Sequence, residues 1–173
     1  MLFQGQYWFY GTHADRVKKL TAEFDGKHKL FSYNHEVYQL APIVGFLYGR
    51  KADQNRTGGS DTSIFPDQIS NYKDVFQFNY QLIMLLDDDY EADFDVRMDK
   101  AFRFYGTDKA ALDEELYESY VRGGVDFLYE KLIEPSASAD DYIKNLYEFM
   151  EDFETQHGQS ADEIYDLCQI ARG

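Results

Sequence analysis

The sequence predicts an all-α protein of about six to eight helices with a short extended segment at its N-terminus. Apolar residues recur at helical spacing through most of the 173 residues, and signals typical of helix starts and stops separate these segments. Apolar residues make up 44% of the chain and aromatic residues 17%, which is enough to fill a core. We therefore expect a helical bundle over residues 1–134, followed by a C-terminal helical hairpin over residues 138–173.

The N-terminal region is expected to be extended and then helical. The aromatic run at residues 6–10 favours a strand or an extended arm. A helix is predicted over residues 12–26, in which Thr12 and Asp15 have the spacing of a capping box. Residues 1–5 resemble the remnant of a viral-protease cleavage site, and they are left out of the functional inference.

The middle of the chain alternates between apolar helices and polar breaks. The apolar spacing predicts helices over residues 34–51, 76–86 and 94–105. Residues 52–63 are polar and contain two adjacent glycines, which predicts a mobile loop. Residues 107–134 form either one long helix or a pair broken in the middle by glycines.

The tail predicts two further helices. Ser138 and Asp141 cap the first helix, which closes at Gly158, and Ser160 opens the second. Cys168, the only cysteine, lies on the apolar face of this second helix, where it acts as a small core residue.

Charge and cysteine content restrict the class of function. With 17 basic and 32 acidic residues the chain carries a net charge of −15, which disfavours nucleic acid and anionic lipid and favours basic protein surfaces. An alternative is that the charge serves solubility alone. One cysteine excludes an internal disulfide and fits the cytoplasm. The chain has neither a run of 18 apolar residues nor a signal-peptide pattern, so we expect no membrane association.

We expect no cofactor, no metal and no catalytic residue. The acidic run from Asp87 to Asp95 lacks the glycine and glutamate that a calcium loop requires, and it is better explained as a solvated turn before a helix. Phosphate-binding and nucleophile motifs are missing from the sequence. A divalent-metal-dependent enzyme remains an alternative, because ligands distant in sequence can meet in the folded chain.

Two sets of residues are predicted to mediate interactions. Glycines that interrupt a long amphipathic helix allow a ligand or another backbone to approach. Aromatic residues are enriched at protein interfaces. The first set of predicted interaction residues is Trp8, Tyr10, Tyr120, Arg122, Gly123 and Gly124. Tight helix packing is the alternative interpretation of the glycines. Basic residues interleaved with aromatics in the first third form a candidate surface for DNA or RNA: Lys18, Lys19, Lys27, Lys29, Arg50, Lys51 and Arg56.

Two segments carry a resemblance to a known family. EVYQLAPIVGFLYGRKA (residues 36–52) and LYESYVRGGVDFLYEKL (residues 116–132) resemble characteristic stretches of small accessory proteins encoded beside bacterial DNA phosphorothioation (Dnd) genes. The matching residues are Ala41, Gly45, Phe46, Glu118, Tyr120, Gly123 and Gly124, whereas Pro42 and Val121-Arg122 depart from the pattern. The resemblance implies a bacterial or phage defence or DNA-modification setting and supplies no catalytic residue.

These observations predict a non-catalytic accessory or adaptor subunit that holds a protein partner, such as a nuclease or DNA-modification complex. The alternative is a nucleic-acid role. In one version the basic N-terminal third contacts DNA or RNA, and in the other the acidic face mimics DNA and inhibits a nuclease.

Overall fold

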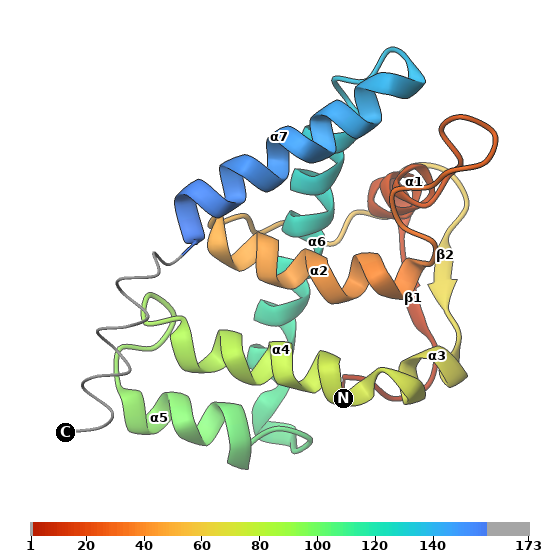
Figure 1. The fold of residues 1–173 in the computed structure, drawn as a ribbon. Helices are drawn as coiled ribbons and strands as arrows, with labels where there is room; N and C mark the ends of the chain where they lie inside the picture. Colours follow the sequence, from red (N-terminus) through yellow and green to blue (C-terminus); the bar gives the residue numbers. More distant parts are fainter. Residues whose placement is uncertain (1, 159–173) are drawn as a thin grey trace.

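The computed structural model describes residues 2–158, and 62% of these residues are helical, which confirms the predicted helical class. Seven α-helices and two short strands are present in this part of the chain (Figure 1). The elements are β1 (Tyr7–Phe9), α1 (Gly11–Leu20), α2 (Asn34–Leu47), β2 (Thr62–Ile64), α3 (Pro66–Asn71), α4 (Lys73–Leu86), α5 (Phe94–Met98), α6 (Ala111–Leu132) and α7 (Ala139–His157). A π-helical turn, Asp99–Arg103, continues α5, and a 3-10 turn, Asp108–Ala110, precedes α6.

Helices α2 and α6 form the centre of the structure, where α6 crosses α2 and α4 (Figure 1). Of the two predicted arrangements for residues 107–134, the continuous helix is the one observed, because α6 runs unbroken through Gly123 and Gly124. A Cβ on Gly124 would overlap the carbonyl oxygen of Ala41, and one on Gly45 would overlap that of Tyr120. These glycines therefore serve close packing between α2 and α6.

The predicted N-terminal strand is confirmed, and its partner was missed. β1 pairs antiparallel with β2, and Tyr7 lies opposite Ile64. The end of the predicted loop at residues 52–63 therefore belongs to a strand. The three residues of β2 are too few to show an alternating pattern, and their pairing partner is distant in sequence.

The first residues of the chain contribute to the core. Phe3 is 7% exposed, and its ring packs against the rings of Tyr38, Phe76, Tyr105 and Tyr117. Such edge-to-face and tilted aromatic contacts stabilise beyond the area they bury. This contact ties the N-terminal segment to α2, α4 and α6.

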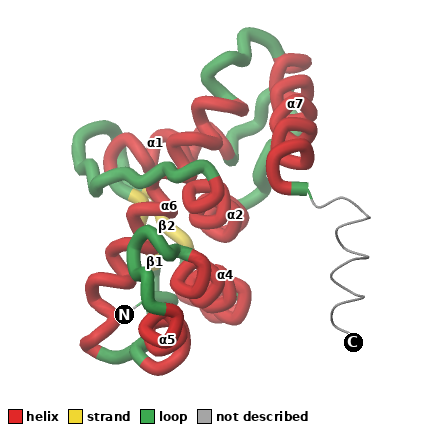
Figure 2. The backbone as a smooth tube through the Cα atoms, turned by 90° about the vertical axis from the view of Figure 1, so that its left-hand side faces the viewer, coloured by secondary structure: helices red, strands yellow, loops and turns green. Residues whose placement is uncertain are grey.

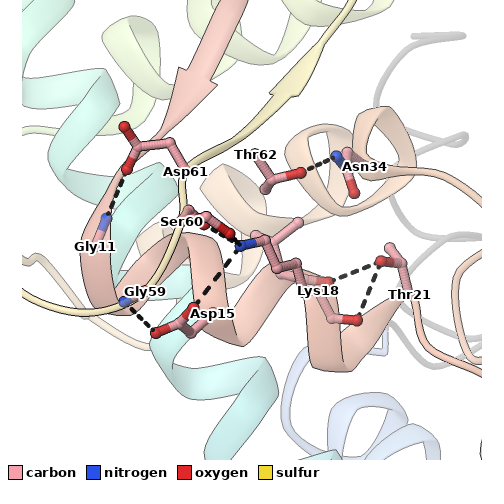
Figure 3. A network of polar contacts seen from close by, with 10 residues as sticks. Gly11, Asp15, Lys18, Thr21, Asn34, Gly59, Ser60, Asp61 and Thr62 are labelled. Atoms are coloured by element: carbon pink, nitrogen blue, oxygen red, sulfur yellow. Dashed lines mark hydrogen bonds and ion pairs between the residues drawn. The ribbon is translucent and has the colours of Figure 1, made fainter.

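The loop between α2 and β2 is fixed to α1 by polar contacts (Figure 3). The amide of Gly59 donates to Asp15 Oδ2 at 3.0 Å, and the amide of Gly11 donates to Asp61 Oδ1 at 3.3 Å. Lys18 Nζ donates to the hydroxyl of Ser60 at 2.8 Å. Helix α1 begins at Gly11 without a side-chain cap, so the predicted capping box of Thr12 and Asp15 is not formed, and Asp15 accepts from this loop instead.

We expect Asp15→Ala to release the loop without unfolding the core. The loss of one charge-assisted hydrogen bond at the surface is worth about 1 kcal/mol, which accelerates amide exchange at Gly59 about fivefold. Hydrogen exchange followed by NMR measures this change. Asp53→Ala, which removes an exposed carboxylate from the same loop, is the matched control and should leave Gly59 unchanged. Equal acceleration in both variants would contradict the anchoring role of Asp15.

Helix boundaries follow the caps. Helix α2 ends at Leu47, earlier than predicted, because Gly49 takes a left-handed conformation with φ 61° and ends the helix. The predicted cap of α7 is confirmed, since the Asp141 carboxylate accepts from the amide and hydroxyl of Ser138 at 2.7 and 2.9 Å.

Figures 1 and 2 show α7 and α5 at opposite ends of the molecule. The second predicted helix of the tail and Cys168 lie outside the described residues.

Candidate functional site

A cavity of about 330 Å³ lies where the N-terminal segment and β1 meet α1, α2 and α6. Its wall is largely aromatic, and its floor carries polar and charged groups. The lining includes Tyr7, Trp8, Tyr10, His13, Tyr38, Glu115, Glu118 and Arg122. We call this cavity the tyrosine–carboxylate pocket.

Glu118 is the central acidic group of the pocket. The hydroxyls of Tyr7 and Tyr38 donate to its two carboxylate oxygens at 2.5 and 3.0 Å. Burial raises the pKa of Glu118 to about 7, although these hydrogen bonds and the nearby charge of Arg122 lower it. The pocket thus holds a carboxyl group that titrates near neutral pH.

Arg122 is buried beside the pocket, and its charge is already paired. Its Nε donates to the carbonyl oxygen of Ala52 at 2.8 Å, and its Nη2 donates to Glu115 Oε1 at 2.5 Å. Only 8% of Arg122 is exposed. Its first role in the structure is therefore to tie α6 to the loop that follows α2.

A second charged group joins α1 to α6 at the edge of the pocket. His13 Nε2 lies 3.3 Å from Asp126 Oδ1, and Arg16 pairs with the same oxygen. Burial alone would raise the pKa of Asp126, but the hydrogen bonds from His13 and Arg16 outweigh it and lower the pKa. The side chain of His13 is therefore held by Asp126.

The structure brings together part of the predicted interaction set. Trp8, Tyr10 and Arg122 line the tyrosine–carboxylate pocket, and Trp8 is 42% exposed at its rim. Tyr120 lies apart, where its hydroxyl donates to the buried carboxylate of Asp87 at 2.7 Å. Gly123 and Gly124 contact the backbone of the segment containing α2 and do not line this pocket.

Sequence reasoning missed the hydrogen-bonded core of the pocket. Tyr7 and Glu118 are 111 residues apart, and Tyr38 and Glu118 are 80 apart. Glu118 and Arg122 are separated by one helical turn, and this spacing is the one local signal that the sequence offers. Tyr7 and Tyr38 carry no local signal of this kind, because tyrosine is common throughout the chain.

The predicted basic residues are dispersed and mostly engaged within the protein. Arg50 Nη2 contacts both carboxylate oxygens of Glu130, at 2.7 and 2.8 Å, and Lys18 contacts Ser60 and Asp15. Three others lie over aromatic rings at 4.3–5.2 Å, namely Lys19 over Tyr129, Lys51 over Tyr120 and Arg56 over Tyr10. Lys27 and Lys29 are exposed in the connection between α1 and α2. The basic residues thus lie on α1, in the connection after α1 and in the segment after α2, and most of them contact other groups of the protein.

The acidic run serves structural contacts. Asp93 caps α5 by accepting from the amides of Asp95 and Val96, as expected for acids before a helix. Asp87 is 3% exposed and accepts from Tyr120 and from the amide of Tyr90. Within residues 2–158, no three acidic, histidine or cysteine side chains are grouped so that they could hold a metal ion.

An apolar stripe runs along α5 and the π-turn that continues it. Phe94, Met98 and Phe102 follow at intervals of four residues and are 58%, 39% and 50% exposed. Ala101 is the buried residue of the π-turn. Aspartates 93, 95 and 99 border the same shallow groove. We call this surface the α5 stripe.

In the part of the chain that the structure describes, no helix combines the length and apolar character needed to cross a membrane.

Comparison with known proteins gives no assignment: no protein-family model, curated protein or solved structure matches this sequence.

Proposed function

We propose that this helical bundle is a non-catalytic accessory or adaptor subunit that holds a protein partner through the α5 stripe. The observation that carries the proposal is the exposure of Phe94, Met98 and Phe102 on one helical face. A contiguous apolar patch of this kind on a folded domain marks an interaction surface, because water contact with it is unfavourable. The stripe also contains two aromatic side chains, which interfaces favour.

The charge around the stripe defines the chemistry of the partner. Asp93, Asp95 and Asp99 border the apolar side chains together with Arg103, which pairs with Asp99, and the whole chain carries a charge of −15. A complementary surface is apolar at its centre and carries lysine or arginine at its rim. Affinity should therefore fall as salt rises, because the rim charges are solvent-exposed and screened.

The biological setting of the proposal rests on the resemblance to accessory proteins of phosphorothioation systems. The two resembling segments form α2 and α6, which pack against each other through their glycines. The shared residues thus support a common core. We propose a cytoplasmic component of a defence or DNA-modification system whose partner is encoded nearby.

Site-specific crosslinking in the native host tests the adaptor function. A photoreactive amino acid replacing Phe102 should crosslink to a defined protein, and mass spectrometry should place the crosslink on an apolar surface with basic residues at its rim. The same amino acid replacing Tyr33, which is 57% exposed on another part of the molecule, is the matched control. Failure to crosslink at position 102, or equal products from both positions, would overturn the proposal.

Once the partner is purified, the double variant Phe94→Lys/Phe102→Lys should weaken the complex at least 100-fold in a titration. The replacement removes two apolar anchors and places positive charges opposite the basic rim. Tyr33→Lys should leave the affinity within about twofold. Unchanged affinity of the double variant would show that the partner binds elsewhere.

A further inference from the structure

We propose that the tyrosine–carboxylate pocket binds an organic cation, an alkylammonium or guanidinium group such as a lysine or arginine side chain provides. This site is distinct from the α5 stripe and is formed by different elements. Three features of the pocket favour a cation, namely the oriented carboxylate, the charges around it and the aromatic wall.

The carboxylate of Glu118 is held in one orientation. Tyr7 from β1 and Tyr38 from α2 each donate one hydrogen bond to it, at 2.5 and 3.0 Å. A carboxylate has about four acceptor positions, so each oxygen retains capacity for a further donor. An ammonium or guanidinium group entering the cavity finds an acceptor that is already fixed, which reduces the entropy lost on binding.

Among the described residues Glu118 forms no ion pair, although the charge of Arg122 is near enough to lower its pKa. Arg122 forms an ion pair with Glu115, and its Nε is taken by the carbonyl oxygen of Ala52. His13 is held by Asp126 instead of facing Glu118 with a free charge. Because Arg122 pairs with Glu115, a cation entering the pocket would balance the second carboxylate, Glu118, when it is ionised.

The wall of the pocket is suited to the apolar stem and the charge of such a cation. Tyr7 and Tyr38, whose hydroxyls contact the carboxylate, pack with ring centroids 4.3 Å apart, and Trp8 lines the pocket while remaining 42% exposed. Cations are attracted to aromatic faces. The protein shows this chemistry at the same rim, where the guanidinium of Arg56 lies 4.3 Å from the centroid of the Tyr10 ring.

Binding should depend on pH, because the cation prefers ionised Glu118. The pKa of Glu118 is raised to about 7, so raising the pH from 6 to 8 converts the group from mostly protonated to mostly ionised. The charged or titratable groups around it are Tyr7, Tyr38, Glu115, Tyr117, Arg122 and His13. The tyrosines have raised pKa values and stay protonated in this range, and comparison with Glu118→Gln isolates the contribution of Glu118.

Fluorescence of Trp8, the only tryptophan of the chain, gives a direct readout at the rim. The full chain is titrated with n-butylammonium, with N-acetyl-lysine methylamide, and with the neutral norleucine analogue of the latter. We expect a saturable change with both cations and at least tenfold weaker binding of the norleucine analogue. Affinity for the cations should increase about tenfold between pH 6 and pH 8. A preference for the lysine derivative would identify a protein side chain as the source, and a preference for butylammonium a free amine.

Glu118→Gln should weaken cation binding at least tenfold and abolish its pH dependence, while circular dichroism confirms that the variant is folded. Glu148→Gln, which removes an exposed carboxylate from α7, is the control and should bind as the wild type does. Equal binding of the neutral analogue, or tenfold tighter binding of acetate than of the cations, would overturn the inference. Cation binding that is unchanged in Glu118→Gln would also overturn it. None of these outcomes bears on the α5 stripe, so the proposed function is tested separately.

Discussion

Gly124→Ala is expected to destabilise the protein by more than about 3 kcal/mol, or to prevent folding, although alanine is the better helix former. In an exposed helix the same replacement would stabilise by about 1 kcal/mol, so the expected effect has the opposite sign. The reason is contact with backbone, since the new Cβ would overlap the carbonyl oxygen and carbon of Ala41 on α2. Backbone atoms of a helix cannot rotate away as a flexible side chain can. Helices α2 and α6 would therefore have to separate along their central contact.

Thermal and urea unfolding measure this effect. A loss of about 3 kcal/mol lowers Tm by about 10 °C in a domain of this size. Leu112→Ala, also on α6, is the matched control, because Leu112 is 78% exposed and should change stability by less than about 0.5 kcal/mol. A Gly124→Ala variant that melts with the wild type would show that the two helices have room to adjust.

The second large effect is a loss of stability as pH rises through the neutral range. In the unfolded chain Glu118 has an ordinary pKa of 4.5, whereas burial raises the folded pKa to about 7. Between these values the folded protein keeps a proton that the unfolded chain releases, so rising pH favours unfolding. The full contribution is up to about 3 kcal/mol and is reached above pH 7. Below pH 4.5 the group is protonated in both states and contributes nothing.

Comparison with Glu118→Gln isolates this contribution. Burial lowers the pKa of His35, so protonation of His35 destabilises the fold as pH falls below 6.5 and opposes the Glu118 effect in the wild type. The difference in unfolding free energy between wild type and Glu118→Gln cancels the His35 contribution. We expect that difference to shift by about 2–3 kcal/mol in favour of the variant between pH 5 and pH 8. Glu148→Gln should show no such shift, and a pH-independent difference for Glu118→Gln would contradict the raised pKa.

Local signals were enough to predict the helical elements. The spacing of Val37, Ala41 and Val44 marks the buried face of α2, and all three are fully buried in the structure. The capping residues Ser138 and Asp141 place the start of α7, because a cap depends on residues three positions apart. At α5 the same spacing places Phe94 and Phe102 on one helical face, and the fold leaves that face exposed. Periodicity shows that a face is apolar, and it does not show what covers that face.

The sequence by itself determined the helical class, the positions of most helices and the acidic character of the surface, since each depends on residues close together or on composition. Only the tertiary structure decided that β1 pairs with β2 and that Phe3 belongs to the core. It also decided that Tyr7, Tyr38 and Glu118 meet in one pocket. Tyr7 and Glu118 are 111 residues apart, and their hydrogen bond exists because α2 and α6 pack closely enough at their glycines to set β1 beside both. Long-range contacts of this kind follow from packing of the whole chain, which no local pattern encodes.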